Sequence, residues 1–167
     1  MIRPVLTYPH PRLTTPALPV VDFAGIGDLL VDLVETMRDH RGPGLAAPQI
    51  GVNKRVFVVD ADGRSDGFRS LTAINPELTG TMGRNLPDTE ACLSLPGAYG
   101  PVRRPWFVRL RYQDDLGSWH ETTFQGFLAR VIQYELDHLN GLMFFDRMAL
   151  VNRRLLFQRF PQYRPTD

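Results

Sequence analysis

The most informative stretch of the chain is Gln133-Tyr134-Glu135-Leu136-Asp137-His138, which lies inside residues 124–141. Apolar residues in this segment recur every three or four positions, a spacing typical of a helix with one face in the core. Charged groups rarely leave water without a compensating partner, and a bound cation is one such partner. A carboxylate and an imidazole on a buried helix therefore indicate a metal site. The apolar positions are Phe127, Leu128, Val131, Ile132, Leu136 and Leu139.

Positions 134 and 138 lie one helical turn apart, so their side chains project from the same face of the expected helix. Zinc hydrolases place histidines at both such positions and use the intervening glutamate on metal-bound water. In this chain His138 keeps the second position, whereas tyrosine occupies position 134. The stretch thus has half of that histidine pair, together with Glu135.

The composition is that of an ordinary soluble globular protein, with 43% apolar and 22% charged residues. We expect one domain over residues 1–167, with a frayed tail at residues 161–167. No run approaches the roughly 18 apolar residues of a membrane span, and prolines interrupt residues 1–13. We therefore expect no membrane segment and no export signal, and a cytoplasmic location follows by default.

The formal net charge is +1, which gives no chain-wide attraction to nucleic acid, and we expect no sequence-specific nucleic-acid binding. Arginines nevertheless gather in the C-terminal segment. A solvated helix face is the simplest interpretation of this cluster, and contact with RNA or another acidic surface is the alternative. The cluster consists of Arg147, Arg153, Arg154, Arg159 and Arg164.

Cys92 is the only cysteine, so no internal disulfide can form. A lone cysteine is more often a small buried residue than a metal ligand, so its neighbours must decide its role.

Other segments show clear helix or strand patterns. The expected helices are residues 22–41 and residues 148–160, the second of them basic and amphipathic. The expected strands are residues 55–60, ended by Asp62-Gly63, and residues 71–75, 106–113 and 118–124. The last two strands should form a hairpin around residues 114–117, and residues 79–89 read as a polar loop.

Three motifs together carry a family resemblance: GPGLAAPQ at residues 42–49, EACLS at residues 90–94 and QYELDH at residues 133–138. In this order and spacing, the chain resembles peptide deformylases over about residues 6–148. Residues 51–60, after the first motif, also look like the family. The resemblance implies an α+β fold, in which antiparallel strands wrap a central helix bearing the third motif, with further helices toward both termini.

The resemblance also implies a metal-dependent hydrolase that removes the formyl group from N-formylmethionyl termini of nascent peptides. The metal in this family is divalent, natively Fe2+ and often Zn2+ or Ni2+ in preparations, and is held by one cysteine and two histidines. Carried over to this sequence, Cys92 would be the thiolate ligand and His138 one imidazole ligand. Glu135 would be the acid-base carboxylate.

Three further roles follow from the same resemblance. The side-chain amide of Gln49 and the backbone N–H of Leu93 would hold the oxyanion of the reacting carbonyl. Gly44 would lie beside the substrate backbone, which binds as an added strand. Because the family works on nascent chains, the basic C-terminal helix suggests a contact with the ribosome.

Two positions depart from the family pattern. Ala91 replaces a glycine, a tolerable change if the backbone there has a negative φ. Tyr134 replaces a histidine, and a phenol oxygen reaches roughly 2 Å farther from Cα than the outer imidazole nitrogen, judged from ordinary bond lengths. The metal must shift, the helix must shift, or the tyrosine must swing away.

Phenolate ligation by Tyr134 would favour a harder ion, and without it Cys92 and His138 leave a two-ligand site. Three possibilities stay open on the sequence alone. The chain is an active metalloenzyme, a catalytically weak or inactive relative that binds peptide N-termini, or an enzyme with altered chemistry.

Overall fold

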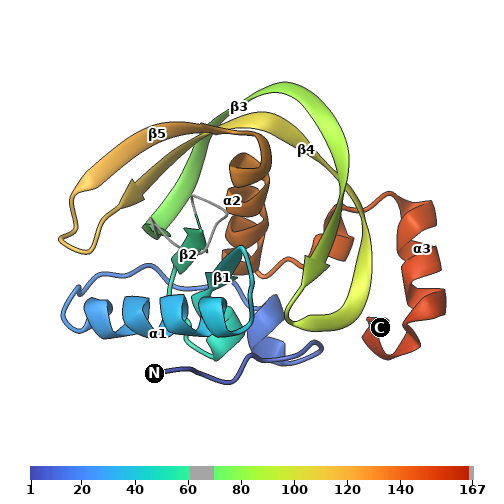
Figure 1. Ribbon diagram of the computed structural model, residues 1–167, viewed down its shortest axis with the longest axis horizontal. Coiled ribbons are helices and arrows are strands. Elements are labelled where there is room, and N and C mark those ends of the chain that lie inside the picture. The colour runs from blue at the N-terminus through green and yellow to red at the C-terminus, as the bar shows by residue number, and fades with distance from the viewer. Residues whose placement is uncertain (61–69, 166–167) are drawn as a thin grey trace.

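The computed structural model describes residues 1–60 and 70–165 (Figure 1). Within these residues, antiparallel strands form one sheet in the order β1-β2-β3-β4-β5, and helices accompany it, which confirms the predicted α+β fold. The strands are β1 (Gly44–Ala46), β2 (Val56–Asp60), β3 (Ser70–Cys92), β4 (Leu95–Gln113) and β5 (Trp119–Gln125). The helices are α1 (Ile26–Asp39), α2 (Gly126–Leu139) and α3 (Leu150–Arg159), with 3-10 turns at Pro11–Thr14, Ala47–Ile50, Phe144–Arg147 and Pro161–Tyr163.

Helix α2 lies beneath the arch formed by β3, β4 and β5 (Figure 1). Its apolar face joins the core of the sheet, where Ile132 and Leu136 belong to one cluster with Phe57 of β2 and Leu110 of β4. The helix ends just before Gly141, whose φ is +74° and whose added Cβ would lie 2.8 Å from a backbone oxygen. The helix predicted within residues 124–141 is therefore confirmed, and its motif is held at the centre of the molecule.

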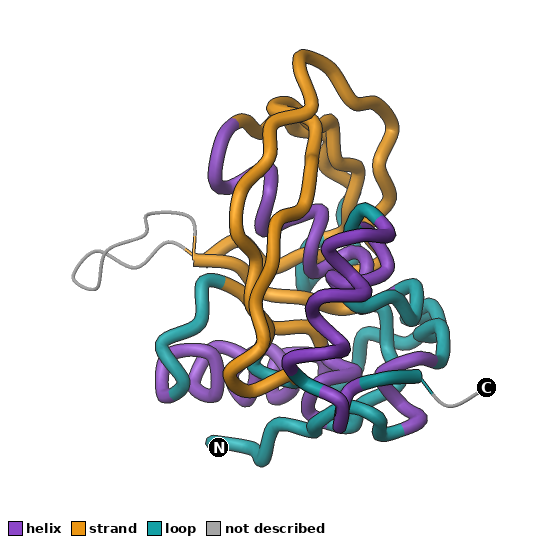
Figure 2. The backbone as a smooth tube through the Cα atoms, turned by 90° about the vertical axis from the view of Figure 1, so that its right-hand side faces the viewer, coloured by secondary structure: helices purple, strands orange, loops and turns teal. Residues whose placement is uncertain are grey.

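The β3 and β4 strands form the long ribbon that carries Cys92 to the core. Figure 2 shows the two strands side by side along most of the molecule's height. The predicted polar loop at residues 79–89 is wrong, because these residues are the middle of β3 and pair with β4 from Gly80↔Arg109 to Thr89↔Pro101. Most of them are exposed and two of the register shifts fall among them, so neither an apolar run nor strict alternation marks the strand.

The other predicted strands are also present. Residues 55–60 and 71–75 fall in β2 and β3, which pair with each other, whereas Asp62-Gly63 lies outside the described residues. The predicted hairpin joins β4 to β5, with Gln113 opposite Trp119.

Helix α1 covers the β1 end of the sheet. Its Leu33 and Met37 are buried against Leu45 of β1 and Val56 of β2. The helix predicted over residues 22–41 begins later, at Ile26, after Gly25 with φ +73°. This packing fixes the short edge strand β1, which contains Gly44.

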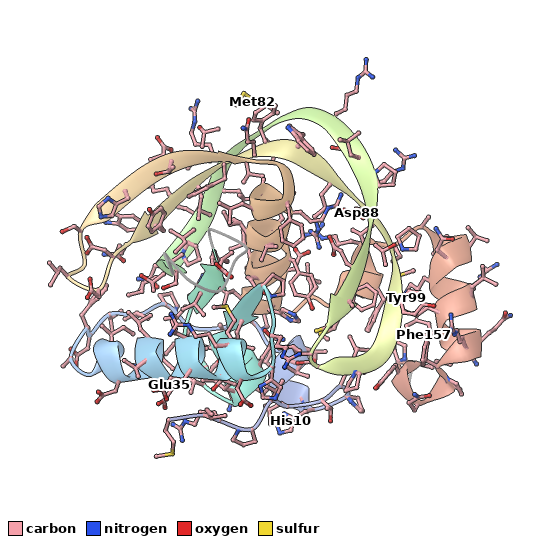
Figure 3. All side chains as sticks on the ribbon, viewed as in Figure 1. His10, Glu35, Met82, Asp88, Tyr99 and Phe157 are labelled. Carbon is pink, nitrogen blue, oxygen red and sulfur yellow. The ribbon has the colours of Figure 1, made fainter. Side chains whose placement is uncertain are left out.

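Helix α3 lies outside the β3–β4 ribbon, with Phe157 and Tyr99 between it and β4 (Figure 3). The predicted amphipathic pattern is wrong in part: Leu156 and Phe157 are buried, but Leu150 and Val151 are 72% and 64% exposed. Within the segment predicted to be a frayed tail, Pro161–Tyr163 form a 3-10 turn, and the Tyr163 hydroxyl donates to Pro96 O at 3.0 Å. Residues 166–167 lie outside the described residues. In the described part of the chain, every helix is too short or too polar to cross a lipid bilayer.

Candidate metal and catalytic site

The second and third sequence motifs meet beneath the sheet. Cys92 ends β3 and His138 lies in the last turn of α2, and Cys92 Sγ is 3.5 Å from His138 Nε2. A tetrahedral ion with bonds of about 2.3 Å to sulfur and 2.0–2.1 Å to nitrogen separates these two ligand atoms by roughly 3.5 Å. Both side chains are buried, so their spacing fits one shared ion.

Tyr134 stands beside this pair. Its ring meets the His138 ring edge-on, with centroids 4.8 Å apart and planes at 88°. The Tyr134 hydroxyl is buried and has no hydrogen-bond partner within the described residues, although it lies near enough to Cys92 to favour the thiolate. An orphaned buried oxygen is costly unless something binds it.

The donor atoms therefore fit a cation, but they are not the one cysteine and two histidines that the resemblance implied. No group of three histidine, cysteine or acidic side chains converges for a metal anywhere in residues 1–60 and 70–165. The atoms near one another are a thiol sulfur, an imidazole nitrogen and a phenol oxygen. These can supply the three protein ligands of a catalytic site only if the oxygen of Tyr134 is one of them.

The first motif brings Gln49 to the same place. Gln49 lies in the 3-10 turn Ala47–Ile50, and its Oε1 accepts the backbone N–H of Ala46 at 2.9 Å. This bond turns Nε2 toward the site, where it donates to Ser94 Oγ at 3.3 Å and to Cys92 Sγ at 3.8 Å. Gln49 thus offers an amide donor beside the thiol.

Glu135 packs directly against the backbone of Gly44. A Cβ added at Gly44 would lie 2.5 Å from Glu135 Oε1, so only glycine leaves room for this carboxylate. Glu135 Oε2 is buried and has no hydrogen-bond partner in the described residues. Both residues line a cavity of about 190 Å³, and Gln49, Leu93, Phe127 and Tyr134 also line it. The cavity is the natural entry for a ligand that reaches Glu135.

Burial favours the neutral form of each of these groups. It raises the pKa of the Cys92 thiol to about 12, and it lowers the pKa of His138 to about 4. Burial, followed by the charge of Glu90, holds the pKa of Glu135 well above its usual value. The pKa of Tyr134 is also raised well above the ordinary phenol value, again chiefly by burial. A cation in the site would oppose all of these shifts except that of His138, because it favours anionic ligands and neutral imidazole.

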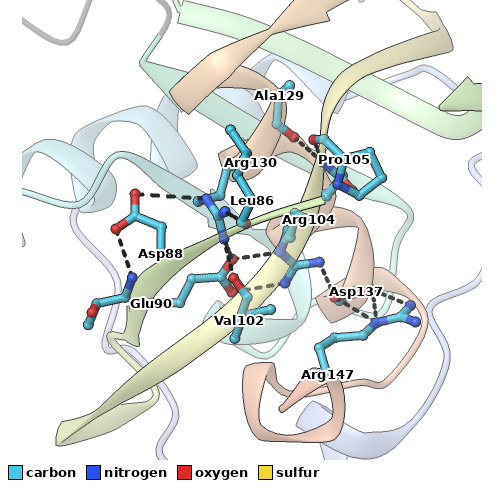
Figure 4. A network of polar contacts seen from close by, with 12 residues as sticks. Leu86, Asp88, Glu90, Val102, Arg104, Pro105, Ala129, Arg130, Asp137 and Arg147 are labelled. Atoms are coloured by element: carbon cyan, nitrogen blue, oxygen red, sulfur yellow. Dashed lines mark hydrogen bonds and ion pairs between the residues drawn. The ribbon is translucent and has the colours of Figure 1, made fainter. Parts of the chain in front are cut away.

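A buried ion network, which the sequence alone did not predict, supports the site from behind (Figure 4). Arg104 Nε and Nη2 donate to the two oxygens of Glu90 at 2.6 and 2.9 Å, and Arg104 Nη1 donates to Asp137 at 2.9 Å. Arg130 donates to Glu90 at 3.0 Å, and Arg147 Nη2 donates to Asp137 at 2.8 Å. Glu90 lies two residues before Cys92 and Asp137 one residue before His138, so the network ties both candidate ligands together.

Only part of this network carried a sequence signal. Glu90 and Asp137 lie inside the quoted motifs, and that position could have indicated a role. Arg104 follows Arg103 in a strand segment with no distinctive pattern, and nothing in the local sequence marks it as buried.

The remaining predicted residues lie near the site or apart from it. Leu93 is half-buried and lines the cavity of Glu135. Ala91 is exposed in β3 and lacks a positive φ, which meets the condition for replacing a glycine. Of the C-terminal arginines, Arg147 joins the ion network through Asp137, whereas Arg153 contacts Asp146 and Arg159 bonds to Tyr99.

Comparisons with known proteins agree with this geometry. The family model described as polypeptide deformylase matches residues 2–154. A peptide deformylase of Acidobacterium capsulatum is 39% identical over 160 residues, which cover 95% of this chain and 94% of that protein.

Solved structures give the same result. The peptide deformylase of Thermus thermophilus matches with a TM-score of 0.90 and 39% identity, covering 97% of this chain and 95% of the other. The peptide deformylase of Synechococcus elongatus, solved in complex with actinonin, matches with a TM-score of 0.87 and 32% identity, covering 99% and 93%. With fold, motifs and relatives in agreement, the chain belongs to the polypeptide deformylase family of hydrolases.

Proposed function

We propose that this protein hydrolyses the formyl group from N-formylmethionyl peptides and releases formate. The observation that carries the proposal is the 3.5 Å separation of Cys92 Sγ and His138 Nε2, with Glu135 on the wall of the adjoining cavity. The arrangement supports a cation site, a proton acceptor and an opening for substrate next to one another.

Cys92 and His138 would hold the divalent ion, and the hydroxyl of Tyr134 would be the third donor. Fe2+ is the proposed native ion, and Zn2+ or Ni2+ are alternatives. When bound, the ion supplies Lewis acidity, which lowers the pKa of water and polarises a carbonyl. A phenol donor is harder than imidazole, which favours Fe2+ over Zn2+ more than a second histidine would.

Glu135 would move the proton. Its carboxylate lies in a dry environment that raises its pKa, a property that suits a group that must both accept and return a proton near neutral pH. It accepts a proton from the attacking water, and it later protonates the methionyl amine as formate leaves. The unpartnered Oε2 is the free atom for this transfer.

Gln49 and Leu93 would stabilise the negative charge that grows on the formyl oxygen. Gln49 is preset for this task, because Ala46 N–H fixes its amide with Nε2 directed toward Cys92. The backbone N–H of Leu93 follows Cys92 directly. Removing one such donor typically slows the chemical step by about 100- to 1,000-fold.

The substrate backbone would bind along β1. Among the strands that the structure describes, β1 is at the edge of the sheet and pairs with β2 alone, so an extended peptide can add beside it. Gly44 in this strand brings the peptide next to Glu135, and the side chain of the first residue would enter the cavity of about 190 Å³.

Formate release tests the proposal. Protein loaded anaerobically with Fe2+, Ni2+ or Zn2+ should release formate from a formyl-Met peptide, whereas Glu135→Gln loaded with the same metal should not. Failure with all three metals, alongside release by Tyr134→His, would show that the natural chain is not a deformylase.

A second candidate function rests on Tyr134. The aromatic ring beside His138 and the buried hydroxyl favour a catalytically weak or inactive relative that binds peptide N-termini in the same cavity. Calorimetry with a formyl-Met peptide should then show binding without turnover. Absence of both binding and turnover would contradict it.

We also propose that the protein contacts the ribosome through α3 and the residues that follow it. Arg154 and Arg164 are exposed, whereas Arg147, Arg153 and Arg159 already have intramolecular partners. Co-sedimentation with ribosomes should weaken in the double variant Arg154→Glu/Arg164→Glu. Unchanged co-sedimentation would exclude this surface as the contact.

A further inference from the structure

A second and larger cavity, of about 490 Å³, lies on a different face of α2 from the cavity of Glu135. Strands β3 and β4, the C-terminal half of α2 and the segment before β2 enclose it. Four arginines line it against two carboxylates, Glu77 and Asp137. The arginines are Arg55, Arg103, Arg104 and Arg147.

The two carboxylates are already engaged. Asp137 receives both Arg104 and Arg147, and the exposed Glu77 contacts Arg111 outside the cavity. The remaining charge of Arg104 is compensated by Glu90. Salt bridges therefore compensate the charges of Arg104 and Arg147. Two further arginines line the cavity.

Arg55 and Arg103 have no carboxylate in salt-bridge contact within the residues that the structure describes. Arg55 donates to Asn140 Oδ1 at 2.9 Å and to the carbonyl oxygens of Leu139 and Pro76 at 3.3 and 3.2 Å. Arg103 donates to the carbonyl oxygen of Asn85 at 3.2 Å. These neutral acceptors hold the guanidinium groups in position but do not cancel their charge.

Among the described residues, Arg55 lacks a carboxylate in salt-bridge contact, and it is also partly buried. Its pKa is lowered, first by burial, and the charge of Glu77 in the same cavity only partly opposes this effect. A half-desolvated cation without a counter-charge gains more from an anion than an exposed arginine does.

A second hollow adjoins this cavity. A neighbouring hollow of about 450 Å³ shares Arg103 and Arg147 and extends along Pro87, Pro101 and Asn152. The two hollows meet at a pair of arginines, so a ligand with two or more anionic groups can contact both.

We propose that this arginine-lined cavity binds the phosphate groups of a polyphosphate-bearing ligand. A guanidinium group can donate two parallel N–H hydrogen bonds to two oxygens of one phosphate. A lysine ammonium does not offer this paired geometry. The ligand must carry at least two phosphate groups near each other. Free polyphosphate and a nucleic-acid backbone both meet this requirement.

Calorimetry with sodium pyrophosphate tests the proposal on the full chain at low salt. Binding should weaken about tenfold or more in Arg103→Gln, because each lost charge-assisted hydrogen bond to phosphate is of that order. Arg103 is exposed and makes one structural hydrogen bond, so this variant should fold normally. Arg41→Gln, after α1, removes the same charge at an exposed position that lines neither hollow, and it should bind like the natural chain.

Competition identifies the source of the phosphates. A labelled single-stranded RNA displaced by pyrophosphate from the natural chain, but bound weakly by Arg103→Gln, assigns the site to a nucleic-acid backbone. Pyrophosphate binding that RNA does not disturb assigns it to a free polyphosphate. No heat with millimolar pyrophosphate, or equal weakening in Arg41→Gln and Arg103→Gln, would overturn the proposal.

Discussion

The two faces of α2 handle buried polar groups in opposite ways. Around Asp137, Arg104 donates three hydrogen bonds to two carboxylates, and these side chains pair almost completely. Around His138, the buried Tyr134 Oη, Glu135 Oε2 and His138 Nδ1 have no partners in the described chain.

The difference separates structural groups from groups held for a ligand. A paired network holds its shape without help, whereas unpaired buried atoms cost free energy until something binds them. The side of α2 with paired polar groups thus holds its structure without a ligand, and it positions the side whose buried polar atoms are unpaired. Removing a polar or charged group near each face should therefore have opposite effects on the stability of the metal-free protein.

The largest loss of stability is expected from Arg104→Met. It leaves Glu90 and Asp137 buried with less compensation, which should lower the free energy of unfolding by about 3–5 kcal/mol. Urea denaturation of the metal-free protein measures this loss. Arg111→Met breaks the exposed pair with Glu77 and should cost no more than about 1 kcal/mol; a similar loss in both variants would contradict the distinction.

Gly44→Ala should be next in size. The new Cβ would overlap Glu135, so overpacking should cost about 1–3 kcal/mol. Displacement of the carboxylate should also reduce formate release in the metal-loaded protein. Gly27→Ala is the matched control: its Cβ meets nothing within 4 Å and it lies in α1, so it should be neutral or slightly stabilising. Normal stability and turnover in Gly44→Ala would show that Glu135 does not depend on this close approach.

Glu135→Gln should stabilise the metal-free protein increasingly as pH rises. Because burial raises the folded-state pKa of Glu135, its contribution to stability is full below the unfolded value of 4.5 and is lost as pH rises toward the folded pKa. Glutamine does not titrate, so the gain should grow by no more than about 1.4 kcal/mol per pH unit above pH 4.5. Urea midpoints at pH 5 and pH 7.5 measure it, and a gain independent of pH would be the contrary result.

The smallest effect is expected from Tyr134→Phe. Removing a buried hydroxyl without a partner should leave the metal-free protein unchanged or more stable by about 1 kcal/mol. The same change should weaken Co2+ binding, followed through thiolate absorption, if the hydroxyl is a ligand. A variant with lower stability and unchanged Co2+ affinity would mean that the hydroxyl is structural.

The sequence was sufficient for the elements with a strong periodic pattern. The helix around residues 124–141 and the hairpin around residues 114–117 follow from apolar spacing and turn residues. The strand at residues 79–89 did not, because its pairing partner is about 20 residues away and its side chains are mostly exposed. Such a strand is fixed by the ribbon as a whole and not by its own residues.

The site was predictable to a similar degree. The approach of Cys92, Gln49 and His138 was expected from three motifs in order, and the structure brings them together. The position of Tyr134 beside His138 follows from helical spacing, but its missing hydrogen-bond partner depends on the surrounding packing. Arg104 escaped notice because a buried arginine in a strand looks like an exposed one until its carboxylate partners are located.

The hydrogen bond from Tyr163 to Pro96 has a consequence for the order of events during biosynthesis. Its two residues are 67 positions apart, and His138 follows Cys92 by 46 positions. On a growing chain, the Cys92 turn is therefore made before either His138 or the tyrosine that bonds to Pro96. The two candidate ligand atoms cannot meet until synthesis has passed residue 138, and the contact between the C-terminal turn and the β4 strand forms later still.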